Sequence, residues 1–177
     1  MVEYMDTFDA IKTRLDFRGY ETRSVPAEVK VRVLEAGRST GSGMNKQHWR
    51  FLLIDDKEAI KKLAQDSTSG GWVSGADFAV VVLTDPTLGF HMIDAGRAVQ
   101  DMELAAWNSG IVSCIYTGVK EESMRRDFGI PKELRPTAVI GFGYPSKKIL
   151  GKKDRKPLTE LAHINKFGNK FDPKKLT

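Results

Sequence analysis

The chain has 177 residues, 41% of them hydrophobic and 29% charged, with a formal net charge of +5 at pH 7. This length suits one domain with a substantial core, and the chain shows neither a membrane-spanning apolar run nor a signal-peptide pattern, so we expect a cytoplasmic protein with no membrane partner. The single cysteine, Cys114, excludes an internal disulfide and a cysteine-rich zinc site.

Apolar residues recur at helical or strand spacing along most of the chain. In chain order the pattern predicts a helix over 5–15, a helix from Pro26 to Gly37, a short buried strand over 51–54, a helix capped by Asp56, a strand over 78–83, a helix over 89–109, a strand over 111–116, a helix over 121–128 and a strand over 138–142. This mixture has no internal repeat and no separating linker, and it favours a single α+β domain over residues 1–177.

Three segments carry a further expectation. Residues 78–83 are almost wholly apolar and β-branched, as in a strand covered on both faces. The helix over 89–109 is apolar around much of its circumference, which places it at the centre of a fold or at a subunit interface, and Gly110 is expected to end it. The serine- and glycine-rich stretch 65–75 predicts a flexible surface loop, with a lid over a site as one interpretation.

The segment 41–51 concentrates small residues, two amides, an imidazole, an indole and a guanidinium. Its glycines let the backbone approach a ligand closely, and Asn45 and Gln47 each donate and accept hydrogen bonds. Such a segment suits a planar heterocycle that carries carbonyls and ring nitrogens. The plainer interpretation is a loop whose Trp49 covers the core.

Cationic side chains gather in two places. Arg14 and Arg18 flank Asp16 after the first helix, and Lys153 alternates with Arg155, so that in an extended backbone both point the same way. Taken alone, each cluster is best interpreted as solvated surface charge. Binding of a phosphate-bearing small molecule is the sharper interpretation, because arginine binds phosphate as a fork. Nucleic acid ranks below both, since no recognisable motif supports it.

A glycine at the end of a strand is a fourth candidate ligand contact, after the segment 41–51 and the two cationic clusters. The strand over 111–116 is followed directly by Thr117 and Gly118. A ligand with a phosphate at one end and a hydrogen-bonding planar ring at the other would use all of these groups, and flavin mononucleotide (FMN) is such a ligand. ATP is a weaker alternative, because the chain has neither a phosphate-binding Gly-x-x-x-x-Gly-Lys-Ser/Thr loop nor a dinucleotide-binding Gly-x-Gly-x-x-Gly. The three histidines lack a metal-ligand spacing, so no metal is expected.

Taken in order, these motifs resemble the nitroreductase family of FMN-dependent oxidoreductases. Where the family has Arg-Arg-Ser-x-Arg-x-Phe, the chain has Arg14-Leu-Asp-Phe-Arg18-Gly-Tyr20. The segment 41–51 resembles the family's Pro-Ser-x-x-Asn-x-Gln-Pro-Trp-x-Phe. The remaining matches are the central helix with its following strand, Gly141-Phe-Gly-Tyr144-Pro145, and Lys153-Asp-Arg155-Lys-Pro157-Leu158.

The resemblance implies an α+β sandwich whose mainly antiparallel central sheet is flanked by helices. It also implies an intertwined homodimer with FMN at the interface, in which residues from about 162 to 177 form an extension that reaches the partner subunit. The residues it assigns to the phosphate and ribityl end are Arg14, Asp16, Arg18, Lys153 and Arg155. Those it assigns to the ring are Ser42, Asn45 and Gln47, with Thr117 and Gly118 near flavin N5.

The implied activity is electron transfer through the flavin. NAD(P)H gives a hydride to N5, and a nitroaromatic, quinone or similar acceptor then takes the electrons, so no catalytic side chain is required. Flavin fragmentation and dehalogenation are alternatives that keep the cofactor and change the reaction. A flavin-binding protein without significant turnover is an alternative of another class.

Two positions depart from the family pattern. Asp16 stands at the usual serine beside the phosphate, where an acid repels the anion unless it turns towards an arginine. His48 replaces the proline after Gln47. The chain is also short for the family and lacks the insertions that shape substrate pockets, so the acceptor is left open.

Overall fold

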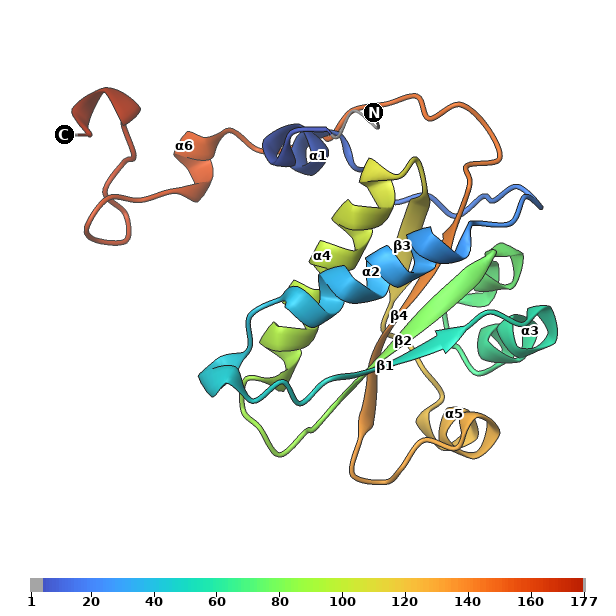
Figure 1. Ribbon diagram of the computed structural model, residues 1–177. Coiled ribbons are helices and arrows are strands. Elements are labelled where there is room, and N and C mark those ends of the chain that lie inside the picture. Colours follow the sequence, from blue (N-terminus) through green and yellow to red (C-terminus); the bar gives the residue numbers. More distant parts are fainter. Residues whose placement is uncertain (1–4, 177) are drawn as a thin grey trace.

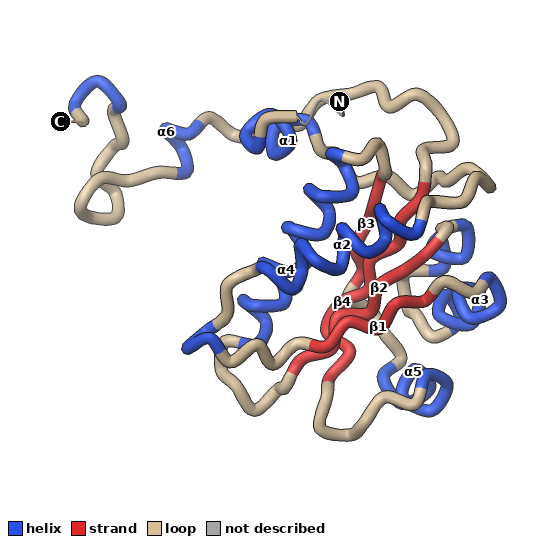
Figure 2. Tube along the Cα trace, in the orientation of Figure 1, coloured by secondary structure: helices blue, strands red, loops and turns tan. Residues whose placement is uncertain are grey.

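The computed structural model describes residues 5–176 and shows a four-stranded antiparallel sheet with helices on both faces (Figures 1 and 2). The strands lie in the order β1-β2-β4-β3, and they are β1 (Arg50–Ile54), β2 (Phe78–Thr84), β3 (Val112–Tyr116) and β4 (Arg135–Gly143). The helices are α1 (Thr7–Thr13), α2 (Ala27–Ser39), α3 (Lys57–Gln65), α4 (His91–Asn108), α5 (Glu121–Phe128) and α6 (Leu158–Leu161). Short 3-10 turns occupy Gly43–Asn45, Gly71–Gly75 and Pro173–Lys175.

The sheet separates two apolar layers, because successive side chains of a strand point to opposite faces. Val80 and Val82 of β2 belong to the layer under α2 and α4. Ala79 and Val81 belong to the layer formed with α3, the turn 71–75 and α5. All seven residues of β2 are buried, which confirms the expectation of a strand covered on both faces.

The long helix α4 lies across one face of the sheet beside α2 (Figure 1). Gly37 of α2 faces Met102 of α4, and a Cβ on this glycine would collide with the methionine side chain. Gly110 follows the helix with a φ of 72° and donates its N–H to the carbonyl of Trp107 at 3.0 Å, so it ends the helix as predicted. On the outward face of α4, Ile93 remains 67% exposed.

Three segments differ from the sequence prediction. Residues 51–54 are mostly half-buried, because β1 is an edge strand. The last strand starts at Arg135 instead of 138. Pro136 pairs with Leu83 just beyond a register shift between Val82 and Leu83, and such irregularities are among the places where a sheet contains proline. The stretch 65–75 is a packed turn and not a flexible loop or lid, since Val73 is fully buried against the second layer.

The C-terminal segment leaves the body of the molecule. Figure 1 shows the chain around α6 extending to one side, beyond α1. Leu158, Leu161 and Phe167 are exposed there, Phe167 by 88%. The rest of the described chain therefore leaves these apolar side chains uncovered. Within residues 5–176, no helix combines the length and apolarity that crossing a membrane requires.

Candidate functional site

Two of the segments predicted to bind a cofactor are attached to α4 at different heights, the 41–48 loop at its first turn and the segment that follows α1 in its C-terminal half. At its N-terminal end, the N–H of Gly43 donates to Asp94 Oδ2 at 3.0 Å. Towards its C-terminal end, Trp107 Nε1 donates to Thr13 Oγ1 at 3.0 Å, one residue before Arg14. At about 1.5 Å per helical residue, Asp94 and Trp107 are about 20 Å apart along the axis. Within one chain, the loop that begins at 41 is therefore separated from the arginines.

Arg14, Asp16, Lys153 and Arg155 line one cavity of about 280 Å³. Asp16 turns towards an arginine, the orientation in which an acid at this position is tolerated, because its Oδ1 accepts a hydrogen bond from Arg14 Nη1 at 2.7 Å. Lys153 donates to the carbonyl of Ile11, so the basic C-terminal segment is attached to α1. Residues far apart in the sequence thus converge on one cationic cavity.

The charges around this cavity favour an anionic ligand. Desolvation lowers the pKa of Lys153 from its ordinary value, and the positive charges of Arg14 and Arg155 lower it further. An anion between these groups would relieve that repulsion. Arg14 Nε is in addition buried with no hydrogen-bond partner among the described residues. Guanidinium and ammonium groups in this arrangement are the donors that a phosphate ester prefers.

Glu103 holds Arg14 from the side of α4. Its carboxylate is buried, lies 3.2 Å from Arg14 Nη1, and accepts from Ser113 Oγ at 3.1 Å. Burial raises the pKa of Glu103, while Arg14 and Ser113 oppose that rise. Sequence reasoning missed this residue. The available signal was an acid on the inner, apolar face of the long helix, where an unpaired acid is rarely found.

Arg18 lies apart from the cavity. The segment that carries it runs beside the edge strand β3, where Asp16 forms a parallel bridge with Ser113 and Phe17 donates its N–H to the Ser113 carbonyl at 2.9 Å. Arg18 Nε donates to Cys114 Sγ at 3.4 Å, and its guanidinium carbon lies 5.4 Å from the centroid of Trp72. Arg18 therefore contacts β3 one residue further along than Asp16 does.

Thr117 and Gly118 follow the last residue of β3. The Gly118 carbonyl accepts from the N–H of Thr68 at 2.8 Å, and a Cβ at Gly118 would collide with the side chains of Thr68 and Ser69. This packing by itself explains a glycine here. At about 3.3 Å per strand residue, Thr117 is about 13 Å from Ser113, so Asp16, Arg18 and Thr117 lie in order along one edge of the sheet.

The loop 41–48 has an unusual backbone. Met44, Asn45 and Gln47 have φ angles of 49°, 53° and 47°, a region that residues other than glycine seldom adopt. The N–H of Gln47 donates to Ser42 Oγ at 3.0 Å. The side chains of Asn45 and Gln47 are exposed and can be reached by a ligand or another subunit, although Gln47 Nε2 already donates to the Asn45 carbonyl at 3.3 Å.

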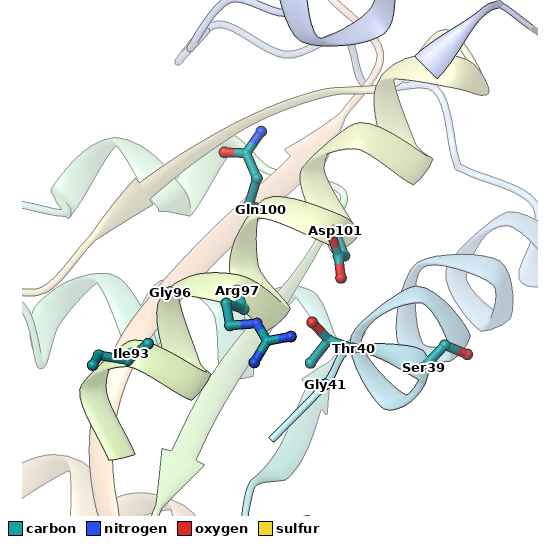
Figure 3. Close-up of a pocket in the computed structure, with 8 residues that line it drawn as sticks. All are labelled: Ser39, Thr40, Gly41, Ile93, Gly96, Arg97, Gln100 and Asp101. Atoms are coloured by element: carbon teal, nitrogen blue, oxygen red, sulfur yellow. The ribbon is translucent and has the colours of Figure 1, made fainter. Parts of the chain in front are cut away.

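A second cavity, of about 530 Å³, adjoins this loop. It lies between the end of α2 and the outward face of α4, and Figure 3 shows the Arg97 guanidinium directed towards Thr40 and Gly41. Gln100 and Asp101 complete the polar side of the cavity. Among residues 5–176, no three histidine, cysteine or acidic side chains are grouped in a way that could hold a metal ion.

Similarity to known proteins extends over most of the chain. The family model described as "Nitroreductase family" matches residues 11–88 and 84–144. The "Putative NADH dehydrogenase/NAD(P)H nitroreductase" of Methanothermobacter thermautotrophicus is 34% identical over 155 residues, which cover 82% of this chain and 81% of that protein. Iodotyrosine deiodinase of Thermotoga neapolitana is 23% identical over 163 residues, covering 78% and 88%. The structure of an FMN-dependent nitroreductase from Clostridium difficile has the same fold, with a TM-score of 0.84 at 23% identity, covering 90% of this chain and 99% of the other.

Proposed function

The chain belongs to the nitroreductase family and is an oxidoreductase, and from this premise we propose that it binds FMN and passes electrons from NAD(P)H to a nitroaromatic, quinone or similar acceptor. The observation that carries the proposal is the convergence of Arg14, Lys153 and Arg155 on one cavity. Their mutual repulsion supports an anionic occupant, and the flavin phosphate is such an anion.

Bound FMN would supply the redox chemistry, by accepting a hydride at N5 and returning the electrons to the acceptor. Arg14, Lys153 and Arg155 would bind its phosphate, with Asp16 orienting Arg14. Arg18, Thr117 and Gly118 follow along the edge of β3, where they would meet the ribityl chain and the N5 side of the ring. Ser42, Asn45 and Gln47 would hydrogen-bond the ring.

The separation of the two groups supports a homodimer. Because Asp94, which holds the 41–48 loop, and Glu103, which holds Arg14, are about 14 Å apart along α4, a second copy would bring the loop of one subunit towards the cavity of the other. Such a dimer would cover the outward face of α4, which exposes Met92 and Ile93, and the apolar side chains of the tail. The extension from about residue 162 to 177 would then lie on the partner subunit.

The proposal is tested by absorbance spectra of the purified protein with FMN, before and after anaerobic addition of NADH and of NADPH. A bound flavin that loses its oxidised absorbance with either donor, and regains it with menadione or nitrofurazone, is the expected result. Protein that acquires no flavin absorbance contradicts the proposal. Light scattering of the full chain and of a form ending at Lys156 tests the dimer, which the shorter form should fail to make.

The similarity to iodotyrosine deiodinase favours one alternative reaction, reductive removal of halogen from an aromatic substrate. Turnover of iodotyrosine that exceeds turnover of nitrofurazone would support this alternative. Bound FMN that neither donor reduces would instead indicate a flavin-binding protein without significant turnover.

A further inference from the structure

His48 lies between the 41–48 loop and the start of α4 and is 8% exposed. Its Nε2 is 3.2 Å from Oδ2 of Asp94, a carboxylate that is 2% exposed. Its other ring nitrogen, Nδ1, accepts a hydrogen bond from the backbone N–H of Asp85 at 3.3 Å. Both nitrogens of this buried ring therefore have protein partners.

These two contacts determine where the proton of the ring lies. Because Nδ1 accepts a hydrogen bond from Asp85, it carries no proton, and the proton is on Nε2. Nε2 then donates to Asp94 Oδ2, the same oxygen that accepts the N–H of Gly43 at 3.0 Å. One buried carboxylate oxygen on α4 thus holds the loop through two donors, the side chain of His48 and the backbone of Gly43.

The surrounding packing leaves the ring little freedom. Phe90 meets the His48 ring edge-on, with centroids 5.9 Å apart. A Cβ on Gly43 would lie 2.6 Å from the Phe90 ring, so the loop is already in close contact with it. The positive φ angles at Asn45 and Gln47 need such external restraint, because residues other than glycine rarely hold them unaided.

We propose that His48 and Asp94 are positioning residues, which hold the 41–48 loop in the conformation that presents Asn45 and Gln47 to the flavin. The family has proline at position 48, which restrains the backbone through its ring. In this chain a side-chain hydrogen bond to α4 provides the restraint. The role towards flavin rests on the proposed function, whereas the anchoring of the loop is a property of the chain without cofactor.

The test compares two substitutions of His48. His48→Gln keeps an amide that can donate to Asp94, whereas His48→Leu fills similar space and can donate nothing. Ile60→Ala serves as the stability control, because Ile60 is fully buried in the layer on the other side of the sheet. Each full-length variant is measured for amide hydrogen exchange over residues 41–49 without cofactor, and for its FMN dissociation constant by flavin fluorescence.

His48→Leu is expected to speed exchange over 41–49 and to weaken FMN binding, each by about tenfold, as for loss of a hydrogen bond to a charged group. His48→Gln should stay within about threefold of the wild type in both. Ile60→Ala should lower Tm and leave both unchanged. Asp94→Asn keeps the shape but offers a neutral acceptor, and a smaller change in the same direction is expected. This variant still tests the pair where His48→Leu fails to fold.

The proposal is overturned if His48→Leu behaves as Ile60→Ala does, with a lower Tm and unchanged exchange and FMN affinity. It is equally overturned if His48→Gln loses as much as His48→Leu, because the bond to Asp94 would then not be the cause. Wild-type protein that binds no FMN contradicts the proposed function. In that case exchange over 41–49 still decides whether His48 anchors the loop.

Discussion

The two ends of α4 hold their parts of the site in different ways. At the N-terminal end, the loop is attached by buried polar contacts from His48 and Asp94. Further along the helix, Arg14 meets Lys153 and Arg155 of the C-terminal segment at one cavity. The three side chains are all positively charged and repel one another. On the proposed function, the end that would meet the flavin ring (the ring end) is organised before a ligand arrives. The end that would meet the phosphate (the phosphate end) would gain from the ligand a negative charge that offsets its own repulsion.

The largest effect is expected at the phosphate end, from Arg14→Met. This change removes a phosphate donor and leaves Glu103 without its cation, so the FMN dissociation constant should rise about 100-fold, since each hydrogen bond to a charged group contributes about 1.5–3 kcal/mol. Fluorescence titration with FMN and with riboflavin, which lacks the phosphate, provides the measurement. Riboflavin binding should change much less.

Arg126→Met is the matched control for Arg14→Met, because Arg126 is an exposed arginine of α5 that pairs with Asp127. It should change neither titration. Equal losses of FMN and riboflavin affinity in Arg14→Met would contradict a separate phosphate end, because the arginine would then stabilise the fold and not bind the phosphate.

At the ring end, Gly43→Ala should cost about 1–3 kcal/mol of stability, because the added methyl group presses on Phe90. It should weaken FMN and riboflavin alike, by about tenfold, because the displaced loop serves the part that both ligands share. Gly129→Ala is the control, since its φ of 64° makes alanine unfavourable by about 1 kcal/mol at a site remote from the loop. A Gly43→Ala variant that discriminates between the two ligands would contradict this division of the site.

The lowered pKa of Lys153 predicts a pH dependence confined to the phosphate end. FMN affinity should fall by about threefold to tenfold as pH rises from neutral to about 10, because the phosphate loses one of its cations. Stability of the cofactor-free protein has the opposite sign. Between the lowered pKa and the ordinary value of 10.5, the unfolded chain binds the proton that folded Lys153 has lost, so this group makes stability rise with pH.

Lys153→Arg is the control for that pH profile, because arginine stays protonated throughout the range. It should keep FMN affinity nearly constant, and a profile as steep as that of the wild type would assign the titration to another group.

The smallest effect requires no mutation. Because Arg155 and its neighbours are exposed, added salt should weaken FMN binding by about twofold to threefold between about 0.05 and 0.5 M. Riboflavin binding should be unaffected. Salt sensitivity of equal size for both ligands would show that the ring end is held by charge as well.

Hydrophobic spacing predicted most of the fold. The strand β2, the helix α5 and the cap at Asp56 appear where the pattern placed them. The pattern failed where tertiary contacts decide, as at Pro136, which pairs with Leu83 beside a register shift, and at the turn 71–75, where Val73 is buried despite a polar composition.

The site was predictable in its residue types and not in its arrangement. Motifs indicated Arg14, Lys153 and Arg155, and the structure brings them together. A polar residue on an apolar helix face reveals that it needs a partner but not which one. For that reason Glu103 could not be linked in advance to Arg14, nor Asp94 to His48.

The bridge between Asp16 and Ser113 has a practical consequence through the next residue, Cys114. This thiol is the only one in the chain, it is 2% exposed, and burial raises its pKa. A thiol-reactive dye can therefore modify the wild-type protein only when the seam between residues 16–18 and β3 opens. The rate of labelling at this one thiol therefore measures how often residues 16–18 separate from β3. A ligand bound beside them should slow the labelling.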